Sequence, residues 1–79
     1  MTIVKACAKR IKDILDEKGL NQYKLYKQSG VPQSTISTIL KGEIQTIKLS
    51  TIYDICASLN IELSEFFNCD YLKLQNLED

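Results

Sequence analysis

Residues 22–41 read QYKLYKQSGVPQSTISTILK and have the pattern of two short helices joined by a turn. Two segments of about eight residues with helical spacing of apolar positions are separated by a turn that contains Gly30. We expect one helix over residues 22–29 and a second over residues 32–41. The apolar positions that would hold both helices on a core are Leu25, Val31, Ile36 and Ile39. Two short helices joined by such a turn form a helix-turn-helix arrangement.

The outward positions of the second helix carry hydrogen-bonding side chains instead of the Glu/Lys pairs that are common on a solvated helix. They are Gln33, Ser34, Thr35, Ser37, Thr38 and Lys41. Glutamine can pair with adenine through two hydrogen bonds, and Ser and Thr adapt to several bases. No acidic residue lies between Ser29 and Gly42, so nothing in this segment repels phosphate. The pattern favours a helix that enters the major groove of DNA. The alternative is a polar first turn on a domain that no longer binds DNA.

Helical spacing continues on both sides of this stretch. We expect a first helix over residues 3–18 that ends at Gly19, and a fourth that runs to about Leu59 with Asn60 as a left-handed stop. A last helix begins near Leu63. It carries Phe66 and Phe67 and extends toward Tyr71 and Leu74. No convincing strand pattern is present, so the sequence predicts an all-α domain of five short helices.

The composition limits the class of protein. The chain has 79 residues, of which 44% are apolar and 25% charged, which is typical of a single soluble globular domain. Its apolar runs are too short for a membrane-spanning helix or a signal peptide. It has no histidine, which removes the commonest general base and metal ligand. We therefore expect no catalytic activity, no metal site, no cofactor and no membrane association.

Three cysteines occur without metal-ligand spacing, and we expect core or neutral roles for them. They are Cys7, Cys56 and Cys69. Free thiols are typical of a reducing compartment, so we expect the protein to be cytoplasmic. A chain of this length leaves no evident place for a ligand-sensing or protease domain, and we expect no small-molecule ligand.

The charge is divided unevenly along the chain although the net charge is zero. Residues 1–49 carry nine Lys/Arg against four Asp/Glu, whereas residues 50–79 carry one Lys against six acidic residues. This division is typical of a polyanion-binding face opposite an acidic back. An ordinary mixed surface is the alternative.

The sequence resembles the phage-repressor (Cro/cI, or XRE) family of helix-turn-helix proteins. The resemblance rests on Leu20–Leu25 and Ser29–Gly42, with Arg10–Lys12, Lys18–Leu20, Thr51–Cys56 and Leu59–Phe67 around them. It implies the five-helix lambda-repressor-like fold, with the helix-turn-helix at helices 2 and 3, and a symmetric dimer on double-stranded DNA. It further implies that Gln33, Ser34 and Thr38 face bases and that Ser37 lies near the DNA backbone. Gln22 would touch a phosphate and brace Gln33. The lysines that flank this surface, as candidate phosphate contacts, are Lys24, Lys27, Lys41 and Lys48.

Three positions depart from the pattern of the family. Tyr26 replaces an alanine at the close crossing of the two motif helices, so its ring must either tilt outward or displace the second helix. Leu40 replaces a glutamate that pairs with the arginine of the first helix, which leaves Arg10 available to a phosphate. Residues 46–48 replace the usual cap of the fourth helix, and Thr46 or Ser50 would cap it instead.

We divide the chain into a DNA-binding domain over residues 1–67 and a helical extension or tail over residues 68–79. Apolar residues at helical spacing continue past the expected core, which predicts a dimer contact through Phe66, Tyr71, Leu74 and Leu77. The sequence as a whole predicts a DNA-binding transcriptional regulator, a repressor that binds a near-palindromic operator as a homodimer. The alternative is a protein-interaction module of the same fold, such as an antitoxin or anti-repressor.

Overall fold

The structure is a computed structural model that describes residues 1–78. The last residue of the predicted tail, Asp79, lies outside the described residues. Within residues 1–78 the chain forms five α-helices and two short 3-10 helices and no strand, which confirms the all-α prediction. The elements are α1 (Ile3–Lys18), α2 (Gln22–Ser29), α3 (Gln33–Leu40), α4 (Leu49–Ser58), α5 (Leu63–Phe67), η1 (Asp70–Leu72) and η2 (Leu74–Asn76).

The helix-turn-helix is bounded by the residues that the sequence indicated. The Asn21 side chain accepts a hydrogen bond from the Lys24 backbone N–H at 2.8 Å and so begins α2. Gly30 ends α2 with a φ of 77°, a left-handed conformation that costs glycine nothing and other residues a steric penalty. Asn60 adopts the left-handed conformation expected of it after α4. The cap of Asn21 and the left-handed conformations of Gly30 and Asn60 therefore determine where α2 begins and where α2 and α4 end.

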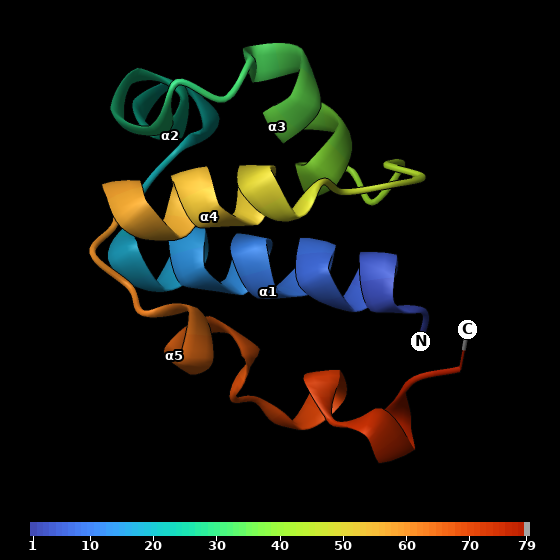
Figure 1. Ribbon diagram of the computed structural model, residues 1–79. Helices are drawn as coiled ribbons and strands as arrows, with labels where there is room; N and C mark the ends of the chain where they lie inside the picture. The colour runs from blue at the N-terminus through green and yellow to red at the C-terminus, as the bar shows by residue number, and fades with distance from the viewer. Residues whose placement is uncertain (79) are drawn as a thin grey trace.

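Helix α1 lies at the centre of the molecule, with α2, α3 and α4 on one side and α5 with the following segment on the other (Figure 1). Its buried residues recur at three- and four-residue spacing, so one broad stripe of α1 meets both sides. The core around it is formed by Ala6, Cys7, Ala8, Ile11, Ile14, Leu15, Leu25, Val31, Ile36, Ile39, Ile52, Ile55, Cys56, Phe66 and Leu72. Cys7 and Cys56 are buried, as expected, and Cys69 is half-buried.

The expectation that the last helix extends toward Leu74 is wrong. Helix α5 ends at Phe67, and residues 69–78, here called the tail, pack back along α1 toward its N-terminal end. The Tyr71 hydroxyl donates a hydrogen bond of 2.8 Å to the Asp13 carboxylate of α1, and the Leu72 side chain is buried. At the far end, the N-terminal amine lies 3.1 Å from the Glu78 carboxylate. Contacts with α1, rather than helical periodicity, therefore determine the course of the tail.

The contact between Tyr71 and Asp13 contributes to stability, and its contribution depends on pH. The hydrogen bond from Tyr71 is the main reason that the pKa of Asp13 lies below its usual value, and Lys9, 3.0 Å from the same oxygen, lowers it further. Burial and then the Asp13 carboxylate raise the pKa of Tyr71. A lowered folded-state pKa stabilises the fold above the unfolded pKa of about 3.9, and this stabilisation is lost as the pH falls through the folded pKa.

We therefore expect Tyr71→Phe to lower the free energy of unfolding at pH 7 by about 1 kcal/mol. The difference from the wild type should shrink in acid, where Asp13 is protonated. Urea denaturation at pH 7 and at about pH 2.5 measures both effects. The control is Tyr53→Phe, because Tyr53 is exposed on α4 and its hydroxyl has no partner within residues 1–78. Equal losses at the two pH values would contradict this account.

Candidate nucleic-acid interface

The packing of α3 determines which of its side chains face solvent. Ile36 and Ile39 are buried in the core on the side of α3 that faces α1. Residues i, i+3, i+4 and i+7 lie on one face of a helix, and on α3 the face opposite the core carries Ser34, Ser37, Thr38 and Lys41. Ser37 is half-buried and the other three are exposed. Gln33 is exposed at the N-terminal end of the same helix. The three predicted base-reading residues are thus all accessible from solvent.

Gln22 braces the start of α3 through the main chain. Its side-chain amide donates a hydrogen bond of 3.2 Å to the carbonyl oxygen of Gln33. Within residues 1–78 the side chain of Gln33 itself makes no hydrogen bond, so its amide stays available to an external partner. A contact between Gln22 and Gln33, as the family resemblance implied, is therefore present. It fixes the backbone of Gln33 and does not fix the rotamer of the Gln33 side chain.

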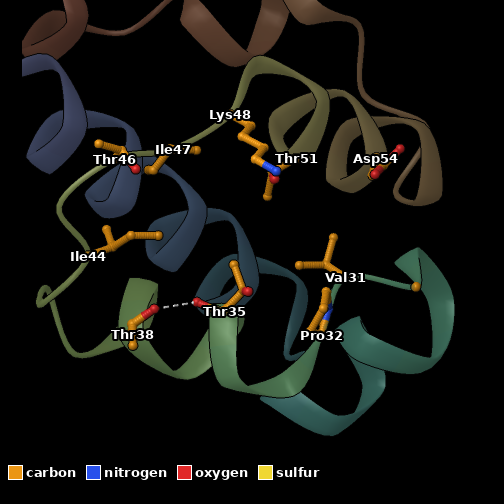
Figure 2. A pocket seen from close by; sticks show the side chains of 11 residues that line it. Val31, Pro32, Thr35, Thr38, Ile44, Thr46, Ile47, Lys48, Thr51 and Asp54 are labelled. Carbon is orange, nitrogen blue, oxygen red and sulfur yellow. Dashed lines mark hydrogen bonds between the residues drawn. The ribbon is translucent and has the colours of Figure 1, made fainter.

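The hydroxyl of Thr38 already uses its proton in a hydrogen bond within α3. It donates to the carbonyl oxygen of Thr35 at 2.9 Å, one turn back along α3 (Figure 2). With its proton used in this way, the hydroxyl oxygen can still accept a hydrogen bond from an amino group of a base, and its methyl group can contact a thymine methyl.

A hollow of about 360 Å³ lies beside α3, between the turn before it, the loop over residues 43–48 and the start of α4. Figure 2 shows Lys48 and Thr51 on the α4 side of the hollow and Thr35 and Thr38 on the α3 side. The residues that line it are Gly30, Val31, Pro32, Thr35, Thr38, Ile44, Thr46, Ile47, Lys48, Thr51 and Asp54. Threonine hydroxyls, one lysine, the Asp54 carboxylate and several apolar side chains therefore surround a concave surface next to α3.

The expectation that Thr46 or Ser50 caps α4 is wrong. Lys48 occupies the N-cap position, and no side chain accepts a hydrogen bond from the first turn of α4. Lysine has no acceptor in its side chain, so it cannot satisfy the N–H groups at the start of a helix. Lys48 and Thr51 both line the hollow beside α3, and the dipole of α4 favours an anion at the N-terminal end of this helix.

The lysines near α3 differ from two lysines of α1, Lys9 and Lys12, in how they are paired. On α1, Lys9 lies 3.0 Å from Asp13 and Lys12 lies 3.6 Å from Asp16. In the part of the chain that the structure describes, none of the four lysines around the helix-turn-helix takes part in an ion pair, and all are exposed. They are Lys24, Lys27, Lys41 and Lys48. No acidic residue occurs between Lys18 and Glu43, so this region keeps its positive charge.

The ring of Tyr26 tilts outward, which is the first of the two outcomes expected for it. It is partly exposed and lies against Tyr23, with 6.2 Å between ring centroids. Ile36 stays fully buried, so the larger side chain does not displace α3 from the core.

Arg10 is not available to a phosphate in the way the sequence suggested. Its guanidinium group donates to the carbonyl oxygens of Phe66 at 2.7 Å and Glu65 at 2.9 Å, at the end of α5. Helix α5 lies across α1 from α3 (Figure 1), so Arg10, which is bonded to α5, points away from α3. Its position indicates that it stabilises the end of α5 by binding its last carbonyl groups.

Lys5 has a role at the site that sequence reasoning missed. Its ammonium group donates a hydrogen bond of 2.7 Å to the carbonyl oxygen of Gly42, just after α3. This contact joins the C-terminal end of α3 to α1. Nothing in the sequence signals it, because any carbonyl group of the main chain can accept such a bond.

The four residues predicted to form a dimer contact do not lie on one face. Phe66 is fully buried in the core, Tyr71 is bonded to α1, and Leu77 packs partly against the core. Leu74 is exposed. The four positions do not share a helix, because α5 ends at Phe67.

The fold and the exposed face of α3 define the chain as a helix-turn-helix domain, in which one short helix supports a second that presents polar side chains to solvent. Residues 10–71 match the family model of the Cro/C1-type HTH DNA-binding domain, and the chain belongs to this family. The protein is thus a DNA-binding protein of the regulator type. Searches of the curated proteins and of the solved structures found no match. No helix within residues 1–78 is long and apolar enough to cross a membrane.

Because Arg10 binds carbonyl groups of α5, we expect it to contribute to the free energy of unfolding and not to DNA binding. Arg10→Ala removes two hydrogen bonds from a charged donor, and we expect it to lower the free energy of unfolding by about 2 kcal/mol. Well below its melting temperature, the variant should bind duplex DNA with the wild-type salt dependence. A slope of log K against log salt that falls by about one would show instead that Arg10 contacts a phosphate.

Proposed function

We propose that this protein is a sequence-specific transcriptional repressor that acts in the cytoplasm and binds a near-palindromic operator as a homodimer. The observation that carries the proposal is the outer face of α3. It is polar, free of acidic residues and held on a buried base of Ile36 and Ile39. A helix presented in this way fits the major groove, where hydrogen bonds to base edges distinguish the four base pairs.

In this proposal, three exposed residues of α3 read base edges: Gln33, Ser34 and Thr38. Gln33 is the best suited to adenine, because its amide can donate and accept at the same time. Six residues position the protein on the DNA backbone: Gln22, Lys24, Lys27, Ser37, Lys41 and Lys48. The unpaired lysines and the uncapped start of α4 support this role, because each offers positive charge or N–H groups to phosphate.

Repression is the simplest form of regulation for such a surface. A protein bound over a promoter competes with polymerase for the same DNA, so occupancy alone represses and needs no surface beyond the DNA contacts. A homodimer suits a near-palindromic operator, because two recognition helices about 34 Å apart enter successive major grooves on one side of the duplex.

Gln33 provides the sharpest test of base reading. We expect Gln33→Ala to cost roughly 1–3 kcal/mol of binding free energy on the preferred duplex and to relax base choice at one position of each half-site. Fluorescence anisotropy with the preferred duplex and with a random duplex measures both effects, and binding to the random duplex should stay nearly unchanged. Equal losses on the two duplexes would assign Gln33 to the backbone instead.

The lysines around α3 provide a separate test of backbone contacts. Each of Lys24→Ala, Lys27→Ala, Lys41→Ala and Lys48→Ala should weaken binding to all duplexes alike and reduce the slope of log K against log salt by roughly 0.9. The matched control is Lys12→Ala, since Lys12 is paired with Asp16 on α1. The electrostatic role would be refuted by a wild-type affinity that does not change between roughly 50 and 200 mM salt.

A further inference from the structure

Two tyrosines on α2 are open to solvent and have no part in the proposed reading of duplex DNA. Tyr23 is 56% exposed and Tyr26 is 36% exposed, whereas Leu25 between them is fully buried and holds α2 on the core. The centroids of the two rings lie 6.2 Å apart, with 55° between the ring planes, so the rings are neighbours on the surface. Grouped exposed side chains of this kind are typical of a surface that another molecule covers.

Two lysines accompany these tyrosines on α2. Residues three and four positions apart share a face of a helix, so Lys27 lies on the face of Tyr23 and Tyr26, and Lys24 lies at its edge beside Lys27. The Lys27 Nζ is 6.0 Å from the centre of the Tyr23 ring, at the outer limit of a cation–π contact. Within residues 1–78 neither ammonium group takes part in an ion pair. We call these four residues the tyrosine–lysine face.

The chemistry of the tyrosine–lysine face suits a nucleic-acid strand whose bases are unpaired. Aromatic rings stack on the flat faces of bases, and lysines attract the phosphates between them. The face is poorly suited to a peptide. Helix α2 has no exposed aliphatic side chain, because Leu25 is buried, and the single arginine of the chain, Arg10, is bonded to α5. Anchoring of an amphipathic helix needs an apolar groove, and recognition of an acidic peptide commonly uses several arginines.

The spacing of the rings favours a separated strand over a duplex. Neighbouring bases in a duplex are stacked about 3.4 Å apart, so each base covers the flat face of the next. The Tyr23 and Tyr26 rings are 6.2 Å apart, and they can therefore stack only on bases that have left the duplex.

We propose that the tyrosine–lysine face of α2 binds single-stranded DNA, with bases stacked on Tyr23 and Tyr26 and phosphates held by Lys24 and Lys27. This activity goes beyond the proposed function, because α3 reads base edges in a groove whereas α2 binds the flat faces of unpaired bases. The two lysines also belong to the proposed backbone contacts with duplex DNA. The tyrosines are therefore the residues that distinguish the two activities.

Binding of a fluorescently labelled oligothymidine of about 12 nucleotides tests the proposal. The matched control strand has the same length and phosphates but no bases, so it can bind the lysines and cannot stack. Anisotropy at about 50 mM salt measures both affinities. We expect the wild type to bind oligothymidine at least about tenfold more tightly than the abasic strand. Because the chain contains no tryptophan, quenching of its tyrosine emission reports the stacking.

Substitutions of the tyrosines test which rings stack. Tyr23→Leu and Tyr26→Leu should each weaken oligothymidine binding about fivefold to a hundredfold, because each removes the stacking partner of one base. Tyr23→Phe keeps the ring and should bind as the wild type does. The matched control is Tyr53→Leu, since Tyr53 is 58% exposed but lies on α4, outside the face. The substituted side chains are exposed, so the variants should fold, and their melting temperatures check this.

Three results would each overturn the proposal: a wild type that does not bind oligothymidine at about 50 mM salt, equal affinities for the two strands, or Tyr23→Leu and Tyr26→Leu variants with wild-type affinity. The preferred duplex separates this inference from the proposed function. Tyr23→Leu should bind that duplex as the wild type does, and a loss there as large as the loss on oligothymidine would also overturn the proposal. A wild type that stacks on oligothymidine but binds all duplexes equally would keep this inference and lose the proposed base reading.

Discussion

The burial of Ile36 and Ile39 against α1 is the contact on which the rest of the site depends. Helix α3 has eight residues and little stability of its own, so tertiary packing must hold it in place. Once these two side chains are buried, helical geometry requires Ser34, Ser37 and Thr38 to face the opposite way. The hydrogen bonds of Gln22 and Lys5 then hold the two ends of α3. The polar face is thus a consequence of how the apolar face packs.

Helix α1 connects the two sides of the molecule. Toward α3 it supplies the apolar surface and the Lys5 ammonium group, and toward α5 and the tail it supplies Arg10 and Asp13. The side that carries α3 keeps its lysines unpaired, whereas the ion pairs of the described residues lie on α1 and the tail. This division matches the uneven charge of the sequence and leaves one side suited to a polyanion and the other to apolar contact.

Much of the fold follows from local signals that a sequence displays. Gly19 and Gly30 mark the ends of α1 and α2 because glycine readily adopts the left-handed conformation that ends these helices, and the spacing of Ile36 and Ile39 predicts the buried face of α3. The course of the tail could not be predicted in this way. Its apolar residues have helical spacing, but Tyr71 bonds to a residue 58 positions away. The partners of Arg10 and Lys5 are main-chain carbonyl groups, which every residue has, so no pattern of residue types reveals them.

We claim that the exposed face of α3 reads a DNA sequence, and selection of binding sites from random duplexes is the direct test. We expect enrichment of one short motif in inverted repeat, with half-site centres about 10 base pairs apart. Within each half-site, the positions with the strongest preference should be those that Gln33, Ser34 and Thr38 reach. Recovery of unrelated duplexes without a shared motif would contradict the claim and favour a protein partner for this surface.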